Sequence, residues 1–152
     1  MLGLINTELI SVMKKRNSWF WNVIIVLTVI VCAFGFGLHY KNWTSLEEGQ
    51  LKITSGIFRQ QIPIETIAEI EFVPKLPKLQ RKKGFSWLAK EKGVFIDSLS
   101  SRRVHVFVDD LRQPKIRMLH SDSLELYFNL SDSLETQMFY NKLNALSSVS
   151  GE

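Results

Sequence analysis

Residues 17–38 read NSWFWNVIIVLTVIVCAFGFGL, an uncharged stretch of 22 residues that divides the chain into two dissimilar parts. A bilayer core about 30 Å thick needs roughly 20 apolar residues in a helix. The stretch meets that need, and we interpret it as a transmembrane helix that holds the protein on a membrane. A cleaved signal peptide is the main alternative, but its apolar part is usually about 7 to 15 residues long. Phe34 and Phe36 also fit its cleavage site poorly.

Basic and aromatic side chains flank this stretch, as expected where a spanning helix meets the headgroups. They are Lys14, Lys15, Arg16, Trp19, Trp21 and Trp43. Because cytoplasmic segments carry an excess of Lys and Arg, the three cations before the helix predict a cytoplasmic N-terminus and an exported C-terminal domain. Residues 1–16 form a short basic N-terminal segment, and translation from either Met1 or Met13 fits it.

Length and charge limit the remaining part to one modest domain. The chain has 152 residues and a net charge of +4, which is too weak to indicate nucleic-acid binding. About 110 residues follow the apolar stretch, enough for one core. Cys32 is the single cysteine and lies in the apolar stretch, so no disulfide framework can form within the chain.

Residues 46–147 show the period-two alternation of half-buried strands. Apolar residues alternate with polar ones around Leu51 and Ile53, around Ile70 and Phe72, and from Leu124 onward. The pattern predicts about seven antiparallel strands in a small barrel or sandwich. Residues 39–45 are expected to be a linker, short enough to keep this domain near the bilayer surface.

The chain ends with a helical period. Asp132 is suited to cap a helix, with Glu135 as the third helical residue of a capping-box variant. One stripe of this helix would hold Leu134, Met138, Phe139, Lys142, Leu143 and Leu146. The helix is expected to end near Ser147, with 148–152 as a flexible tail. The predicted fold class is mainly β (α+β): one transmembrane helix, then a seven-stranded antiparallel barrel closed by a C-terminal amphipathic helix.

Residues 51–73 (LKITSGIFRQQIPIETIAEIEFV), 75–87 (KLPKLQRKKGFSW), 104–118 (VHVFVDDLRQPKIRM) and 126–143 (LYFNLSDSLETQMFYNKL) follow one another in an order and spacing that resemble bacterial pleckstrin-homology (PH) domains. The resemblance covers roughly residues 46–146. It implies a PH fold and frequent membrane association, without a settled activity or a transferable binding residue. Many relatives carry two membrane helices before the domain, whereas this chain has one. The first hairpin holds Lys52 and Arg59 without the full cation pattern of phosphoinositide-binding PH domains.

The strongest polar feature is a basic segment with apolar residues between its cations. Its candidate contact residues are Lys75, Lys78, Arg81, Lys82, Lys83 and Trp87. Each cation near an anionic membrane surface contributes about 1 kcal/mol. We interpret the segment as a loop that lies on anionic lipid or binds an acidic partner. The alternative is a solvated loop from which Trp87 folds back into the domain.

No catalytic, cofactor or metal motif accompanies these features. His39, His105 and His120 lack the spacing of metal ligands. Two tripeptides, at Asn42 and Asn129, match the glycosylation pattern. The sequence therefore predicts a membrane-anchored binding module without enzyme activity, cofactor or nucleic-acid partner. Its partners would be the lipid bilayer and either a membrane protein or a second copy of the chain. The alternative function is a structural subunit or scaffold of a membrane complex.

Overall fold

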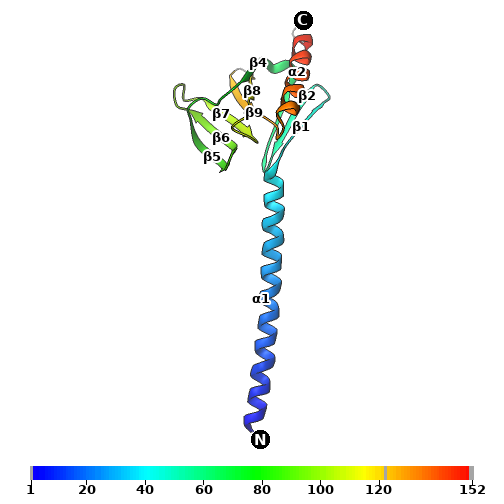
Figure 1. The fold of residues 1–152 in the computed structure, drawn as a ribbon, viewed down its shortest axis with the longest axis vertical. Helices are drawn as coiled ribbons and strands as arrows, with labels where there is room; N and C mark the ends of the chain where they lie inside the picture. The colour runs from blue at the N-terminus through cyan, green and yellow to red at the C-terminus, as the bar shows by residue number, and fades with distance from the viewer. Residues whose placement is uncertain (1, 122, 151–152) are drawn as a thin grey trace. The chain divides into compact units, whose positions relative to one another are not determined.

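The computed structural model describes the backbone of residues 2–121 and 123–150 and the side chains of residues 18–37, 40–121 and 123–148. This part of the chain is mainly β, with two α-helices and two sheets (Figure 1). Two compact units meet between Gly37 and Leu38. The elements are α1 (Leu2–Tyr40), β1 (Asn42–Glu47), β2 (Gln50–Ser55), β3 (Phe58–Pro63), the 3-10 turn η1 (Ile64–Thr66), β4 (Ile67–Val73), β5 (Leu79–Trp87), β6 (Lys90–Asp97), β7 (Arg103–Val108), β8 (Lys115–His120), β9 (Leu124–Phe128) and α2 (Ser133–Ser150).

The first unit ends at Gly37 and contains the apolar part of α1. From Ser18 to Gly37 this helix is long and apolar enough to cross a membrane, with a mean hydropathy of 2.3. Its polar Thr28 donates its hydroxyl to the carbonyl oxygen of Ile24, which satisfies that group within the helix. The prediction of an apolar N-terminal helix is confirmed. A signal sequence would pass the same test of length and composition.

The described residues of the second unit hold nine strands in two sheets, where the sequence predicted about seven in a barrel. β1, β2 and β3 form an antiparallel sheet, and the other sheet has the order β4-β8-β9-β7-β6-β5. Within the described residues neither sheet closes into a barrel. β7 and β9 pair in parallel, which departs from the predicted all-antiparallel arrangement. The reason is that β8 pairs on the outer side of β9, so the chain returns beside β7 running in its original direction.

The two additional strands are β1 and β5. β1 occupies most of the stretch expected to be a linker, and β5 takes up the basic segment expected to be a loop. Both are outermost strands of their sheets. An outermost strand needs few apolar side chains, because much of its surface remains in water. The period-two apolar signal is therefore weak in both strands.

The main core lies where the two sheets and α2 meet. Its buried residues are Leu51, Ile53, Ile62, Phe107, Ile116, Met118, Leu126, Phe128 and Leu143. These positions include the apolar halves of the alternating patterns, which confirms the half-buried strands. A second cluster, formed by Phe95, Val104, Val106, Val108 and Tyr127, is covered by Leu76 and Leu79 from the basic segment. The segment thus contributes apolar side chains to the core while its cations stay outside.

α2 begins as the sequence predicted. The Asp132 side chain accepts hydrogen bonds from the backbone N–H groups of Leu134 and Glu135, at 2.7 and 3.0 Å, which is N-cap geometry. The helix continues to Ser150, beyond the expected end at Ser147. Its buried face is rotated from the predicted stripe. Leu143 is fully buried, whereas Leu134 and Met138 are exposed.

Candidate functional site

The basic segment becomes an exposed strand at one edge of the six-stranded sheet. β5 pairs with β6 on one side only, and Leu79 and Phe85 are its half-buried residues. Arg81, Lys82 and Lys83 are exposed. Cations on an edge strand have a structural role of their own, because they discourage the pairing of edges between copies. The loop prediction is wrong for residues 79–83, since their backbone is hydrogen-bonded to β6.

Most cations of the basic segment make no ion pair with another described residue. In the described part of the chain, no ion pair involves Lys75, Lys78, Lys82 or Lys83. By contrast, Arg117 contacts the carboxylates of Glu69, Glu71 and Glu125 at 2.7 to 3.2 Å. Positive charge is therefore neutralised on the strands near Arg117 and left in excess along β5.

Arg81 is the partial exception among the cations of β5. Burial raises the pKa of the Glu91 carboxyl on β6, and the positive charge of Arg81 acts in the opposite direction. The Glu91 carboxylate therefore offsets part of the positive charge of Arg81. Lys82 and Lys83 remain the centre of the uncompensated charge.

Two glycines and a bulge shape the basic strand. The register between β5 and β6 shifts between Arg81 and Lys83, so Lys82 lies at a bulge. One step further, Gly84 faces Gly93 with φ angles of +149° and +144°. A Cβ on either glycine would collide with backbone of the other strand, at Lys92 O or Lys83 O. Only glycine allows this close approach.

The two ends of β5 lie at opposite ends of the domain. Near Leu79, the carbonyl oxygen of Lys78 accepts the N–H of Ser98, and we call this the far end. Trp87 pairs with Lys90, whose Nζ donates to the carbonyl oxygen of Tyr40 and lies 4.5 Å from the centre of its ring. We call the end with Tyr40 and Lys90 the entry end, because the chain enters the domain there. The nine residues of β5 make eight steps of about 3.3 Å, which separate its two ends by about 26 Å.

The structure therefore separates the predicted contact residues. Lys75 and Lys78 precede β5 at the far end, Arg81, Lys82 and Lys83 lie within β5, and Trp87 lies at the entry end. Trp87 is 51% exposed, so it does not fold back completely into the domain. Of the residues expected to flank the membrane helix, Trp19, Trp21 and Trp43 are exposed. The side chains of Lys14, Lys15 and Arg16 lie outside the described residues.

A buried polar network, which sequence reasoning missed, fixes the entry end. The side chains of Lys92 and Asp109 are both fully buried, and their Nζ and Oδ1 atoms lie 2.7 Å apart. The other carboxylate oxygen of Asp109 accepts the N–H of Asn42 at 2.7 Å and the hydroxyl of Ser131 at 3.2 Å. Burial lowers the pKa of Lys92, while Asp109 opposes that shift.

Two buried asparagines complete this network. Asn42 donates its side-chain amide to the carbonyl oxygens of Phe107 and Asn129. Asn129 accepts the N–H of Asp109 at 2.7 Å and donates to the carbonyl oxygen of Asp110. Both glycosylation tripeptides therefore have their asparagine buried and hydrogen-bonded in the folded domain. Partners 65 to 87 residues apart leave no signal in sequence spacing, so the pattern alone did not reveal them.

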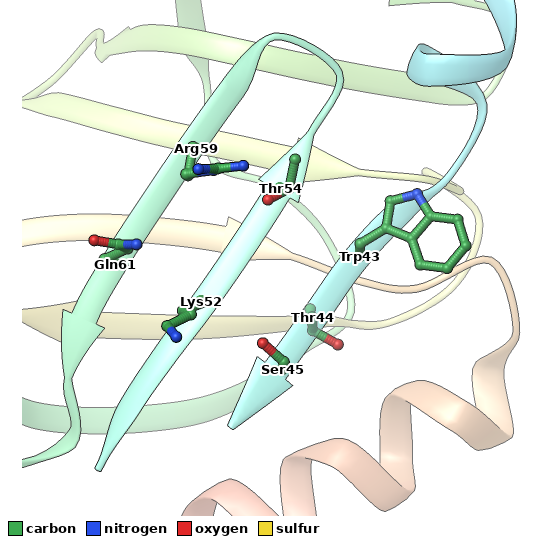
Figure 2. Close-up of a pocket in the computed structure, with 7 residues that line it drawn as sticks. All are labelled: Trp43, Thr44, Ser45, Lys52, Thr54, Arg59 and Gln61. Carbon is green, nitrogen blue, oxygen red and sulfur yellow. The ribbon is translucent and has the colours of Figure 1, made fainter. Parts of the chain in front are cut away.

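A shallow polar hollow of about 380 Å³ lies on the outer face of the three-stranded sheet (Figure 2). Two cross-strand rows line it, Trp43–Thr54–Arg59 and Ser45–Lys52–Gln61. Lys52 is 2.9 Å from Glu47, and its hydrogen bond with that carboxylate raises the pKa of Lys52. Arg59 is then the cation of the hollow that makes no ion pair within the described residues, a weaker concentration of charge than on β5.

Metal ligands are not gathered in the described part of the chain, where no group of three His, Cys, Asp or Glu side chains could hold an ion. His105 and His120 are each at least half-buried, and burial lowers the pKa of both. The strongest candidate site is therefore the basic strand β5. Comparisons of this chain with known protein families, curated proteins and solved structures gave no match.

Proposed function

We propose that this protein is a non-catalytic, membrane-anchored binding module whose basic strand β5 contacts an acidic surface of a membrane protein partner. The observation that carries the proposal is the row of exposed cations without ion pairs. Lys82 and Lys83 keep their electrostatic potential for a partner, because no carboxylate among the described residues pairs with them. Charge complementarity of this kind sets specificity and speeds association.

The bulge at Lys82 supports a side-chain contact over the addition of a further strand. Strand addition needs a regular row of free backbone groups. A bulge interrupts that row, and adjacent Lys and Arg side chains repel a second basic edge. A folded acidic surface meets the protruding cations without requiring a regular ladder. This favours an acidic partner over self-association through β5.

The length of β5 supports a protein partner over lipid of the same membrane. The strand rises about 26 Å from the entry end to the far end. Tyr40, at the entry end, follows the candidate span by three residues. The cations Arg81, Lys82 and Lys83 lie four to six residues from Trp87, about 13–20 Å along the strand, whereas a headgroup layer is only about 5–8 Å thick. A neighbouring protein that rises from the membrane can follow the strand along its length.

In this proposal α1 crosses the bilayer between Ser18 and Gly37. The basic residues before it support a cytoplasmic N-terminus and an exported domain. The resemblance to bacterial PH domains stays a prediction. The separate sheets and the parallel β7–β9 pair supply no closed barrel to support it.

Charge reversal in the full-length chain tests the proposal. The variant Lys82→Glu/Lys83→Glu is compared with Arg59→Glu/Lys142→Glu, which reverses two exposed cations elsewhere. Proteins that co-purify from native membranes are quantified for both. We expect the amount of a stoichiometric partner that co-purifies to fall about tenfold for the β5 variant. The reason is that two reversed contacts together contribute roughly 1.4 kcal/mol to binding. The control variant should retain it. Equal retention, or equal loss, by the two variants contradicts the proposal.

A further inference from the structure

Two hairpin tips at the entry end carry large aliphatic residues in water. The β2–β3 hairpin turns at Gly56–Ile57, and Ile57 is 78% exposed. The β5–β6 hairpin turns at Leu88–Ala89, and Leu88 is 91% exposed. Two-residue hairpin turns normally hold Gly, Asn or Asp. Gly56, with φ +63°, meets this requirement in the β2–β3 turn, so turn formation does not call for an aliphatic residue at Ile57 or Leu88.

Leu88 also has an unfavourable backbone conformation. Its φ is +52°, in the left-handed region that disfavours residues with a Cβ. The Leu88 side chain therefore lies outside the core, and its backbone conformation does not favour the turn. Residues kept in strained conformations often have a functional role.

The contacts of the domain place both tips at the entry end. Asn42 pairs with Ser55, the residue directly before the β2–β3 turn. On the other side, Lys90 is the first residue after the β5–β6 turn and pairs with Trp87. Its Nζ donates to the carbonyl oxygen of Tyr40. Asp109 joins the two sides, since it accepts the N–H of Asn42 and lies 3.9 Å from the Nζ of Lys90. The first strand and both hairpins are thus fixed together by buried and half-buried polar contacts.

The covalent chain limits how far this end can be from a membrane that holds α1. Tyr40 is three residues beyond Gly37, where the candidate span ends. Three extended residues reach at most about 11 Å. The polar headgroup layer is about 5–8 Å thick on each side of a bilayer. The entry end is therefore within reach of the headgroup layer.

We propose that the hairpin tips with Ile57 and Leu88 insert into the lipid interface of the membrane that α1 spans. The inference rests on the proposed membrane span and concerns lipid, whereas the proposed partner of β5 is a protein. Exposed Tyr40 and Trp43 suit the same layer, because aromatic rings concentrate there. Such docking directs the far end of β5 away from the bilayer, toward a neighbouring protein.

A fluorescent label at single cysteines tests the docking in the full-length chain. NBD is attached in nanodiscs of neutral lipid to Ile57→Cys or Leu88→Cys, each in a Cys32→Ala background. The matched control is Leu99→Cys, because Leu99 is 90% exposed in the β6–β7 turn at the far end. Quenching by lipids spin-labelled near the headgroup is compared. We expect about threefold greater quenching at 57 and 88 than at 99, as insertion into the interface requires.

Native Cys32 separates failure of the docking from failure of the span. NBD on Cys32 of the otherwise unchanged chain should be quenched by lipids that are spin-labelled deep in the acyl chains. If Cys32 is quenched and positions 57 and 88 match position 99, the docking is overturned while the span holds. If Cys32 is not quenched, the span and the docking are both overturned. Hydrogen exchange of residues 55–58 and 86–90 in unlabelled chain gives an independent measurement, with slower exchange expected in nanodiscs than in detergent.

Discussion

Lys92 and Lys83 lie on neighbouring strands but have opposite environments. Lys92, on β6, is fully buried with its Nζ 2.7 Å from Asp109. Lys83, on β5, is exposed and pairs with no carboxylate in the described part of the chain. The first cation is committed to the fold, because removal of its partner would leave a buried charge. The second costs the fold little and is available to a partner. Charge in the sequence therefore says where cations are, and burial says which of them can bind.

The largest expected change in stability follows from breaking the buried pair of Lys92 and Asp109. Asp109→Asn should lower the free energy of unfolding by about 3–5 kcal/mol, since it leaves the Lys92 charge buried without a counterion. Pulse proteolysis of the full-length chain in detergent, across a urea series, measures this. Glu47→Gln, which breaks the exposed pair with Lys52, is the control and should cost less than about 1 kcal/mol. Similar losses for the two variants would show that burial does not separate the two kinds of pair.

A double substitution should recover much of that loss. Lys92→Met with Asp109→Asn removes both charges and leaves an amide oxygen that can accept the N–H of Asn42. Replacement of a whole buried pair is often close to neutral, so we expect recovery of about 2 kcal/mol or more over Asp109→Asn alone. The same proteolysis series gives the value. A double variant as unstable as the single one would mean that the hydrogen bonds, and not the buried charge, dominate.

A pH dependence is expected where the two strands meet at Glu91. Burial raises the folded-state pKa of this carboxyl above its ordinary value. Its stabilising contribution is therefore full below the unfolded pKa near 4.5 and is lost as pH rises through the folded pKa. Glu91→Gln should be slightly more stable than the natural chain at pH 7, with the advantage shrinking toward pH 4.5. An advantage that does not vary with pH would contradict this origin.

The smallest effect on stability is expected from the available cations. Lys82→Glu/Lys83→Glu should change the free energy of unfolding by no more than about 0.5 kcal/mol, because the side chains are exposed and make no ion pair within the described residues. Thermal unfolding of the full-length chain followed by circular dichroism checks this. A large destabilisation would assign these residues to the fold and weaken their assignment to binding.

The sequence predicted the features that depend on one segment at a time. The apolar run of α1, the alternation of Leu51 and Ile53, and the Asp132 cap all follow from local spacing. The missed strands β1 and β5 lie at sheet edges, where side chains stay in water and the apolar period fades. The parallel pairing of β7 with β9 depends on where β8 docks, which no local pattern states.

The candidate site was located by composition, while its geometry came from the structure. The cations from Lys75 to Lys83 were evident as a basic run. Their arrangement on an edge strand about 26 Å long, with Trp87 at the other end from Lys78, was not. The network of Asn42, Asp109 and Asn129 joins residues far apart in sequence. A buried Asp has the same sequence appearance as one in a turn, so spacing could not separate them.

Site-specific photo-crosslinking tests the central claim most directly. A photoreactive residue replaces Lys82 in the full-length chain, and Arg59 in the control, and both chains are irradiated in native membranes. The account predicts one discrete protein crosslink from position 82, absent from position 59 and lost when Lys78, Arg81 and Lys83 are changed to Glu. Crosslinks from position 82 only to lipid, or the same crosslinks from both positions, would contradict the account.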